Sequence, residues 1–191
     1  VLLVPGPLAQ VGAIAAAGLV GLLWLRPASA GADAAEPFEV RVPRWAAIGS
    51  LAAFAVLLAG LPILAAVTGD GVLGRFDTFY RAGALVFGGG HVVLPLLEGG
   101  LVPDIVDADT FLAGYGLAQA VPGPLFTFAS YLGMASGGVL GAVVATLAIF
   151  LPSMLLLIAV MPVWAKQAAN PRARGAVAAI NAAVVGLLGA A

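Results

Sequence analysis

Two stretches of this sequence place glycine, proline and polar side chains inside long apolar runs. The first contains Gly88, Gly89, Gly90 and His91, the only histidine in the chain. The second contains Gln119, Pro122, Gly123, Pro124 and Thr127, and Ser130 follows one turn later. Their common chemistry is hydrogen-bond donation, by side chains and by the backbone N–H groups that a broken helix leaves free. Groups of this kind bind anions.

The second stretch has the pattern of a helix start. Pro122 keeps the residue before it out of helical geometry, whereas Gly123 suits a cap and Pro124 suits the first helical position. We therefore expect a half-helix to begin at Pro124. The amides of Leu125 and Phe126 would then be free to donate hydrogen bonds.

The triple glycine predicts a second half-helix. Pro95 fits only into the first turn of such a helix, where no backbone donor is needed, so the helix is expected to start near Val92 with His91 at its mouth. Two helix N-termini facing each other at mid-membrane would form an anion site. Close helix packing alone, or an ordinary interfacial turn at 122–124, are the alternative interpretations.

The energy of binding decides how many groups such a site needs. One helix terminus contributes about 0.3–1 kcal/mol, or about 2 kcal/mol when partly buried, whereas removing water from an ion costs several kcal/mol. Further donors are needed, and the candidates are His91, Gln119, Thr127, Ser130 and Arg81. Arg81 precedes His91 by about 15 Å along a helix, so we expect it to attract the ion electrostatically rather than hold it.

The elements that must position these groups are membrane helices. Hydrophobic residues make up 62% of the chain and charged residues 9%, whereas charged residues are about a quarter of a soluble protein. A net charge of −1 argues against nucleic acid as a partner. The absence of cysteine excludes disulfides and thiolate metal sites, and we expect no metal and no cofactor. Neither an acid pair nor a serine with a base lies in the apolar runs, so an enzyme is not expected.

Apolar segments of membrane length predict an all-α polytopic fold, since one span needs about 20 residues. They cover residues 8–25, 45–68, 76–101, 111–137 and 139–164, and another begins at 175. The breaks lie in 76–101 and 111–137, and the polar residues 26–44 predict a linker. Because the chain starts with valine and ends inside an apolar run, we expect it to be part of a longer protein.

The charges between these segments predict their orientation. Lysine and arginine collect in residues 26–44 and 166–174, so both loops are expected in the cytoplasm. The two broken segments must then either both cross the membrane or both re-enter it from one side. Residues 98–109 carry four acids and no base, which favours re-entry.

The motifs at both breaks resemble the chromate transporter family. The resemblance is carried by residues 87–98, 117–125 and 127–133; it is specific over 76–191 and loose over 1–75. Its family-type positions are Gly88, Gly89, Gly90, Pro95, Gln119, Pro122, Gly123 and Pro124. Proteins of this family have two homologous halves of opposite orientation and export chromate from the bacterial cytoplasm.

The resemblance implies that residues 45–191 are the C-terminal half of an inverted-repeat transporter, with residues 1–25 as the last helix of the N-terminal half and 26–44 as a cytoplasmic linker. It implies chromate efflux and chromate resistance in the bacterial inner membrane. The partners would be chromate, the bilayer and the missing N-terminal half, with homo-oligomers left open. A carrier for sulfate, which is a dianion of similar shape, a channel and a non-transporting scaffold are the alternatives.

Overall fold

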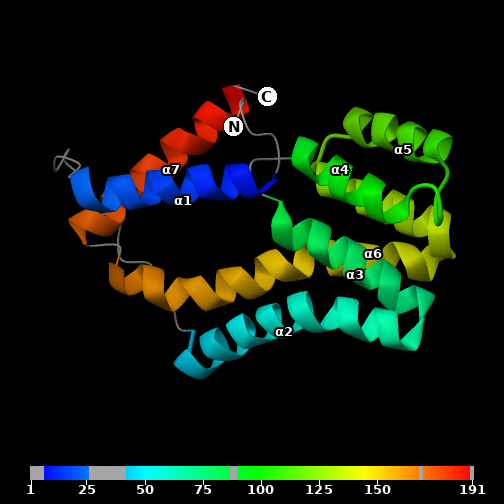
Figure 1. Ribbon diagram of the computed structural model, residues 1–191, viewed down its shortest axis with the longest axis horizontal. Coiled ribbons are helices and arrows are strands. Elements are labelled where there is room, and N and C mark those ends of the chain that lie inside the picture. The colour runs from blue at the N-terminus through cyan, green and yellow to red at the C-terminus, as the bar shows by residue number, and fades with distance from the viewer. Residues whose placement is uncertain (1–6, 26–41, 87–89, 168–169, 190–191) are drawn as a thin grey trace. The chain divides into compact units, whose positions relative to one another are not determined.

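The computed structural model describes residues 7–25, 42–86, 90–167 and 170–189, and all regular secondary structure in them is helical (Figure 1). The helices are α1 (Pro7–Trp24), α2 (Arg44–Thr68), α3 (Gly71–Leu85), α4 (Gly90–Leu101), α5 (Ala108–Ala120), the 3₁₀ helix η1 (Leu125–Thr127), α6 (Phe128–Gln167) and α7 (Pro171–Gly189). They belong to two compact units, one drawn from residues 1–48 and 158–191 and the other from residues 49–157.

In the first unit, α1 and α7 lie side by side (Figure 1). A Cβ added at Gly21 would collide with the backbone of Gly175, and one added at Gly175 would collide with the carbonyl oxygen of Leu25. Glycine at these positions lets the two backbones approach closely, as in packed membrane helices. The helix expected from 175 onward is present and begins earlier, at Pro171.

In the second unit, α3 and α4 form an antiparallel hairpin (Figure 1). A Cβ added at Gly100, near the end of α4, would lie 2.5 Å from Cγ2 of Thr78 in the middle of α3. The chain therefore reverses between Val86 and Gly90. The segment 76–101 is thus a pair of short helices that lie against each other, and not one kinked span.

A second hairpin joins α5 to the start of α6. Gly114 of α5 faces the ring of Tyr131, and a Cβ there would overlap that ring. Next to this contact, the rings of Phe111 and Phe128 meet edge to face with centroids 5.0 Å apart, an arrangement that aromatic quadrupoles favour. The chain therefore also reverses between α5 and α6.

Helix α6 is itself a hairpin. Its backbone leaves helical geometry at Gly137 and Gly138, and Gly138 has φ 63°, a left-handed conformation that glycine adopts without steric cost. The short arm before this turn lies against the long arm after it, because Gly133 and Gly141 meet backbone to backbone. The sequence prediction that one segment ends at 137 and the next span starts at 139 is confirmed.

Helix lengths can be compared with the predicted segments. In the described residues, α2 and the stretch Leu125–Trp164 are long and apolar enough to cross a membrane, but the second contains the turn at Gly137, so only its long arm can cross in one pass. Helices α3, α4 and α5 have 15, 12 and 13 residues, which makes them about 18–22 Å long. A bilayer core is about 30 Å thick, so none of these three helices is long enough to cross it alone.

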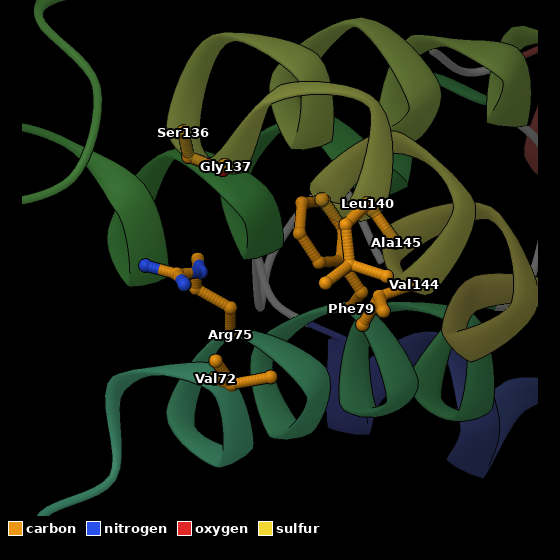
Figure 2. Close-up of a pocket in the computed structure, with 9 residues that line it drawn as sticks. Val72, Arg75, Phe79, Ser136, Gly137, Leu140, Val144 and Ala145 are labelled. Carbon is orange, nitrogen blue, oxygen red and sulfur yellow. The ribbon is translucent and has the colours of Figure 1, made fainter.

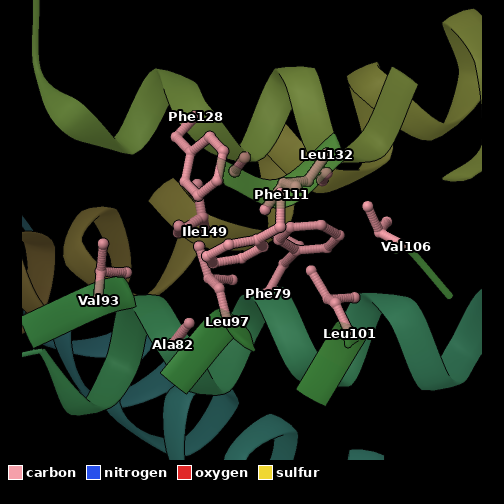
Figure 3. Packing of buried hydrophobic residues seen from close by; sticks show 13 residues of the cluster. Phe79, Ala82, Val93, Leu97, Leu101, Val106, Phe111, Phe128, Leu132 and Ile149 are labelled. Carbon is pink, nitrogen blue, oxygen red and sulfur yellow. The ribbon is translucent and has the colours of Figure 1, made fainter. Parts of the chain in front are cut away.

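One cluster of buried side chains holds both hairpins against the long arm of α6 (Figure 3). Its large members are Phe79 from α3, Val93, Leu97 and Leu101 from α4, Phe111 from α5, and Phe128, Leu132 and Ile149 from α6. Lipid tails are as apolar as these side chains, so the stabilisation comes from close packing rather than from transfer out of water. The cluster thereby fixes where the two breaks lie.

Candidate functional site

The first break lies between α3 and α4. Val86 ends α3 with extended backbone, at φ −78° and ψ 116°. Gly88 and Gly89 lie outside the described residues, and so does the side chain of His91. The backbones of Gly90 and His91 form the start of α4, and the amides of a first helical turn have no acceptor within their own helix.

The start of α4 differs from the sequence prediction. The helix begins at Gly90 rather than near Val92, so Pro95 lies inside it and not in its first turn. A proline at this position removes one helical bond, the one to the carbonyl of His91. The prediction of a start near Val92 was wrong, because Gly90 and His91 extend the helix toward its N-terminus although this one bond is missing.

The second break is an exposed turn over residues 121–124. Pro124 caps η1 with φ −68° and ψ 136°, so the half-helix starts at Leu125, one residue after the predicted position. Its first turn is a 3₁₀ turn, in which the amide of Thr127 donates to the carbonyl of Pro124 at 3.0 Å. No acceptor for the amides of Leu125 and Phe126 occurs among the described residues.

The two breaks lie close together in the second unit. Helix η1 contacts α4, and the ring of Phe126 packs against Phe150 on the long arm of α6 at 5.8 Å. The residue before it, Ile149, has its backbone against Gly83 of α3, shortly before the first break. A continuous helix through either segment, or a large distance between the two breaks, would have excluded a shared site. The structure shows neither.

Two of the predicted hydroxyl donors are already engaged. Thr127 Oγ1 donates to the carbonyl of Pro124 at 3.0 Å. The Thr146 hydroxyl donates its one hydrogen to the carbonyl of Ala142 at 2.6 Å. Ser130 must therefore be the donor in the 2.6 Å hydrogen bond between Ser130 and Thr146. In this geometry neither Thr127 nor Ser130 has a hydroxyl hydrogen left for an ion.

The other two predicted side chains are exposed. Gln119 lies in the last turn of α5, next to the second break. Arg81 lies in the last third of α3. Gly123 has open space around it, since a Cβ there would meet no atom within 4 Å. Access to the second break is therefore not closed by the described residues of this chain.

Two carboxylates cap helices at the ends away from the breaks, whereas Asp77 lies in the middle of α3. Asp70 caps α3 by accepting a bond from the amide of Val72 at 2.7 Å. Asp107 caps α5 by accepting bonds from the amide and the hydroxyl of Thr110 at 2.8 and 2.7 Å, and these bonds lower the pKa of Asp107 below its ordinary value. Both acids are thus one helix length away from the amides of the breaks.

Sequence reasoning missed one basic residue that lines a cavity. Arg75 lies on the face of α3 that also carries Val72 and Phe79 and that packs against α6. The signal was present in the spacing, because residues at i, i+3 and i+7 share one face of a helix. A cation on an otherwise apolar face is the pattern that could have identified Arg75.

Comparisons with known proteins agree with the motifs at the breaks. The family model of the chromate transporter matches residues 73–191. A probable chromate transport protein from Synechococcus elongatus is 33% identical over 133 residues, which are 67% of this chain and 34% of that protein. A chromate transport protein from Cupriavidus metallidurans is 30% identical over 157 residues, which are 76% of this chain and 37% of that protein.

A shorter relative is also similar. The uncharacterized transporter YwrB from Bacillus subtilis is 38% identical over 114 residues, which are 56% of this chain and 58% of that protein. The chain thus spans about a third of the length of the two chromate transport proteins and somewhat more than half of YwrB. No solved structure matches the chain.

Proposed function

Because the chain belongs to the chromate transporter family and is an integral membrane protein, we propose that it forms part of a carrier that moves chromate across the membrane. The two breaks form the binding site in this proposal. The observation that supports it best is the contact between η1 and α4, because each of these helices begins at one of the two breaks. Each start supplies free amides and the positive end of a helix dipole.

The amides of the two helix starts supply much of the energy for binding a dianion, and further donors are needed to complete it. The amides of Leu125 and Phe126 belong to one helix start, and those of Gly90 and His91 to the other. Four hydrogen bonds to charged oxygens contribute about 6–12 kcal/mol together, which offsets a dehydration cost of several kcal/mol. Gln119 adds a donor at the rim, and the exposed Arg81 attracts the ion. His91 remains a predicted donor, since its side chain lies outside the described residues.

The remaining motif residues shape this site. Gly123 keeps a side chain away from the amides of the second break, while Pro122 and Pro124 hold the turn open. Gly88 and Gly89 remain predicted site residues outside the described part of the structure. The hydroxyls of Thr127 and Ser130 act on the site through their bonds to Pro124 and Thr146, which fix the start of α6. Parts of the protein outside this chain would complete the coordination, as expected for one half of an inverted repeat.

We further propose that both hairpins re-enter the membrane from the side opposite the linker 26–44. Helix α2 runs from Arg44 to Thr68 and is long enough to cross, so α3 starts at the far side, next to Asp70. A hairpin about 20 Å deep in a core about 30 Å thick places the breaks about two thirds of the way across. The breaks would then lie nearer to the cytoplasm, where chromate is collected for export.

The charges favour outward movement. Moving a dianion out of a cell that is negative inside gains about 4.6 kcal/mol per 100 mV, twice the value for one charge. The acidic helix caps at Asp70 and Asp107 would repel an anion that has reached the outer side and so promote its release. Efflux of this kind from a bacterial inner membrane would confer chromate resistance.

The test is chromate flux in vesicles that contain the whole gene product. We expect a saturable flux that is accelerated by a positive potential on the receiving side and is inhibited by sulfate. Current that rises linearly with chromate concentration would identify a channel instead. Flux of sulfate alone would reassign the substrate, and intact protein without any oxyanion flux would refute transport.

A further inference from the structure

We propose that Arg75 and the turn of α6 form a second oxyanion position, on the outer side of the two breaks. This inference rests on the proposed function, because it concerns the route of the same ion. The position is a cavity of about 50 Å³ between α3 and the α6 hairpin. Its lining includes Val72, Arg75, Phe79, Ser136, Gly137 and Leu140 (Figure 2).

The walls of this cavity are mostly apolar, and their polar side chains are Arg75 from α3 and Ser136 from the α6 turn. Phe79, Leu140 and Val144 form the apolar part (Figure 2). Arg75 is half-buried, and its Nη2 atom would lie 3.9 Å from a Cβ at Gly137. Ser136 Oγ donates to the carbonyl of Gly133 at 3.3 Å, so it keeps its hydroxyl directed into its own helix. The guanidinium is therefore the main donor that faces the cavity.

The guanidinium lacks an acceptor in the described part of the chain. Neither a hydrogen bond nor an ion pair of Arg75 occurs there, although a guanidinium carries five N–H donors. Holding a partly buried cation without acceptors is unfavourable. The cavity has room for one or two waters, and the oxygens of a tetrahedral oxyanion can take their place and accept two of the guanidinium bonds at once.

The place of Arg75 along α3 gives the position a role. Arg75 precedes Val86 by eleven residues, which is about 16 Å along a helix. An ion that leaves the breaks toward the outer side would therefore meet one more cation before it reaches the acidic cap Asp70. A single arginine binds more weakly than four amides and two helix ends, so we infer a transient exit position.

Cysteine labelling tests this proposal directly. The chain contains no cysteine, so a Ser136→Cys variant in a cysteine-free whole gene product places one thiol in the cavity wall. Two methanethiosulfonate reagents, one carrying a sulfonate and one carrying a trimethylammonium group, then report the charge of the cavity. We expect the anionic reagent to react about tenfold faster than the cationic one, and millimolar sulfate to slow it.

Replacement of the arginine decides the outcome. Arg75→Gln should lower the ratio of the two rates about tenfold and abolish protection by sulfate, whereas Arg75→Lys should keep most of both. Arg174→Gln, which removes an exposed arginine of α7, is the matched control and should change neither. A ratio that is the same with and without Arg75, or a thiol that neither reagent reaches, would overturn the proposal.

Combining Gly123→Leu with the Ser136→Cys labelling assay distinguishes a failure of this inference from a failure of the proposed function. Gly123→Leu should weaken chromate binding at the breaks but leave the labelling ratio at Ser136→Cys unchanged. If Gly123→Leu leaves chromate binding intact while the ratio still depends on Arg75, the site at the breaks is wrong and the outer position stands. The opposite combination of results refutes the outer position alone.

Discussion

Replacing Gly123 with leucine should block the site without disturbing the fold. Gly123 lies in the exposed turn before η1, its φ is outside the left-handed region, and a Cβ there would meet no atom within 4 Å. A leucine therefore fits without strain. Its side chain would occupy the approach to the amides of Leu125 and Phe126, which follow directly after Pro124.

The size of the effect follows from the hydrogen bonds that would be lost. Two bonds from amides to charged oxygens contribute about 3–6 kcal/mol. Since about 1.4 kcal/mol corresponds to a tenfold change in affinity, the Kd for chromate should rise about 10²- to 10⁴-fold. The thermal unfolding midpoint should stay unchanged, because no buried contact is altered.

Equilibrium binding of radiolabelled chromate to the purified whole gene product measures this change. Gly116→Leu is the matched control, because Gly116 is exposed on α5 of the same hairpin and also has no atom within 4 Å of an added Cβ. It should leave the Kd unchanged. The reasoning fails if Gly123→Leu binds chromate as the natural protein does, or if both variants weaken binding equally.

Three further variants test the packing and the caps. Gly133→Ala should lower the free energy of unfolding by about 1–3 kcal/mol, measured by denaturant titration, because the new Cβ meets the backbone of Gly141; a neutral result would contradict the close approach of the two α6 arms. Ser130→Ala should lower the free energy of unfolding by about 0.6 kcal/mol, and at most by about 1.7 kcal/mol. It should not change the Kd for chromate by more than about twofold, since this hydroxyl donates to Thr146. A large rise in Kd would show that the hydroxyl binds the ion instead. Asp107 has a lowered pKa, so its cap stabilises α5 above the ordinary aspartate pKa and is lost as the pH falls through the lowered value. The protection factor of the Thr110 amide, which compares its exchange with the intrinsic rate at the same pH, should therefore fall at acidic pH, and Asp107→Asn should remove this dependence.

The positions of the breaks could be predicted from sequence because they depend on local chemistry. Proline fixes φ and glycine relieves steric limits, so residues 122–124 predict the start of η1 to within one residue. The lengths of the apolar runs predict the end of one segment at 137 and the start of the next at 139, and the turn at Gly137 and Gly138 lies at this boundary. The prediction for Pro95 was wrong because one missing bond inside α4 is tolerated.

The path of the chain between these points depends on contacts that no local pattern contains. Apolar length alone does not distinguish a span from two short helices folded together, and the reversal after Val86 becomes evident only from Gly100 lying against Thr78. The engagement of Ser130 by Thr146 is a contact of the same long-range kind. The free amides of the second break, in contrast, follow from residues 121–126 themselves.

The buried cluster around Phe79 has a mechanical consequence. Phe111 and Phe128 of the second hairpin share this cluster with Leu97 of the first and Ile149 of the long α6 arm, so pulling the two turns apart would open a void among large side chains, at about 2–5 kcal/mol for each one displaced. In the proposed carrier, the geometry of the ion's donors would thus be retained when the ion is exposed first to one compartment and then to the other. Such alternation would require the second unit to move as a rigid body within its surroundings while the ion stays bound.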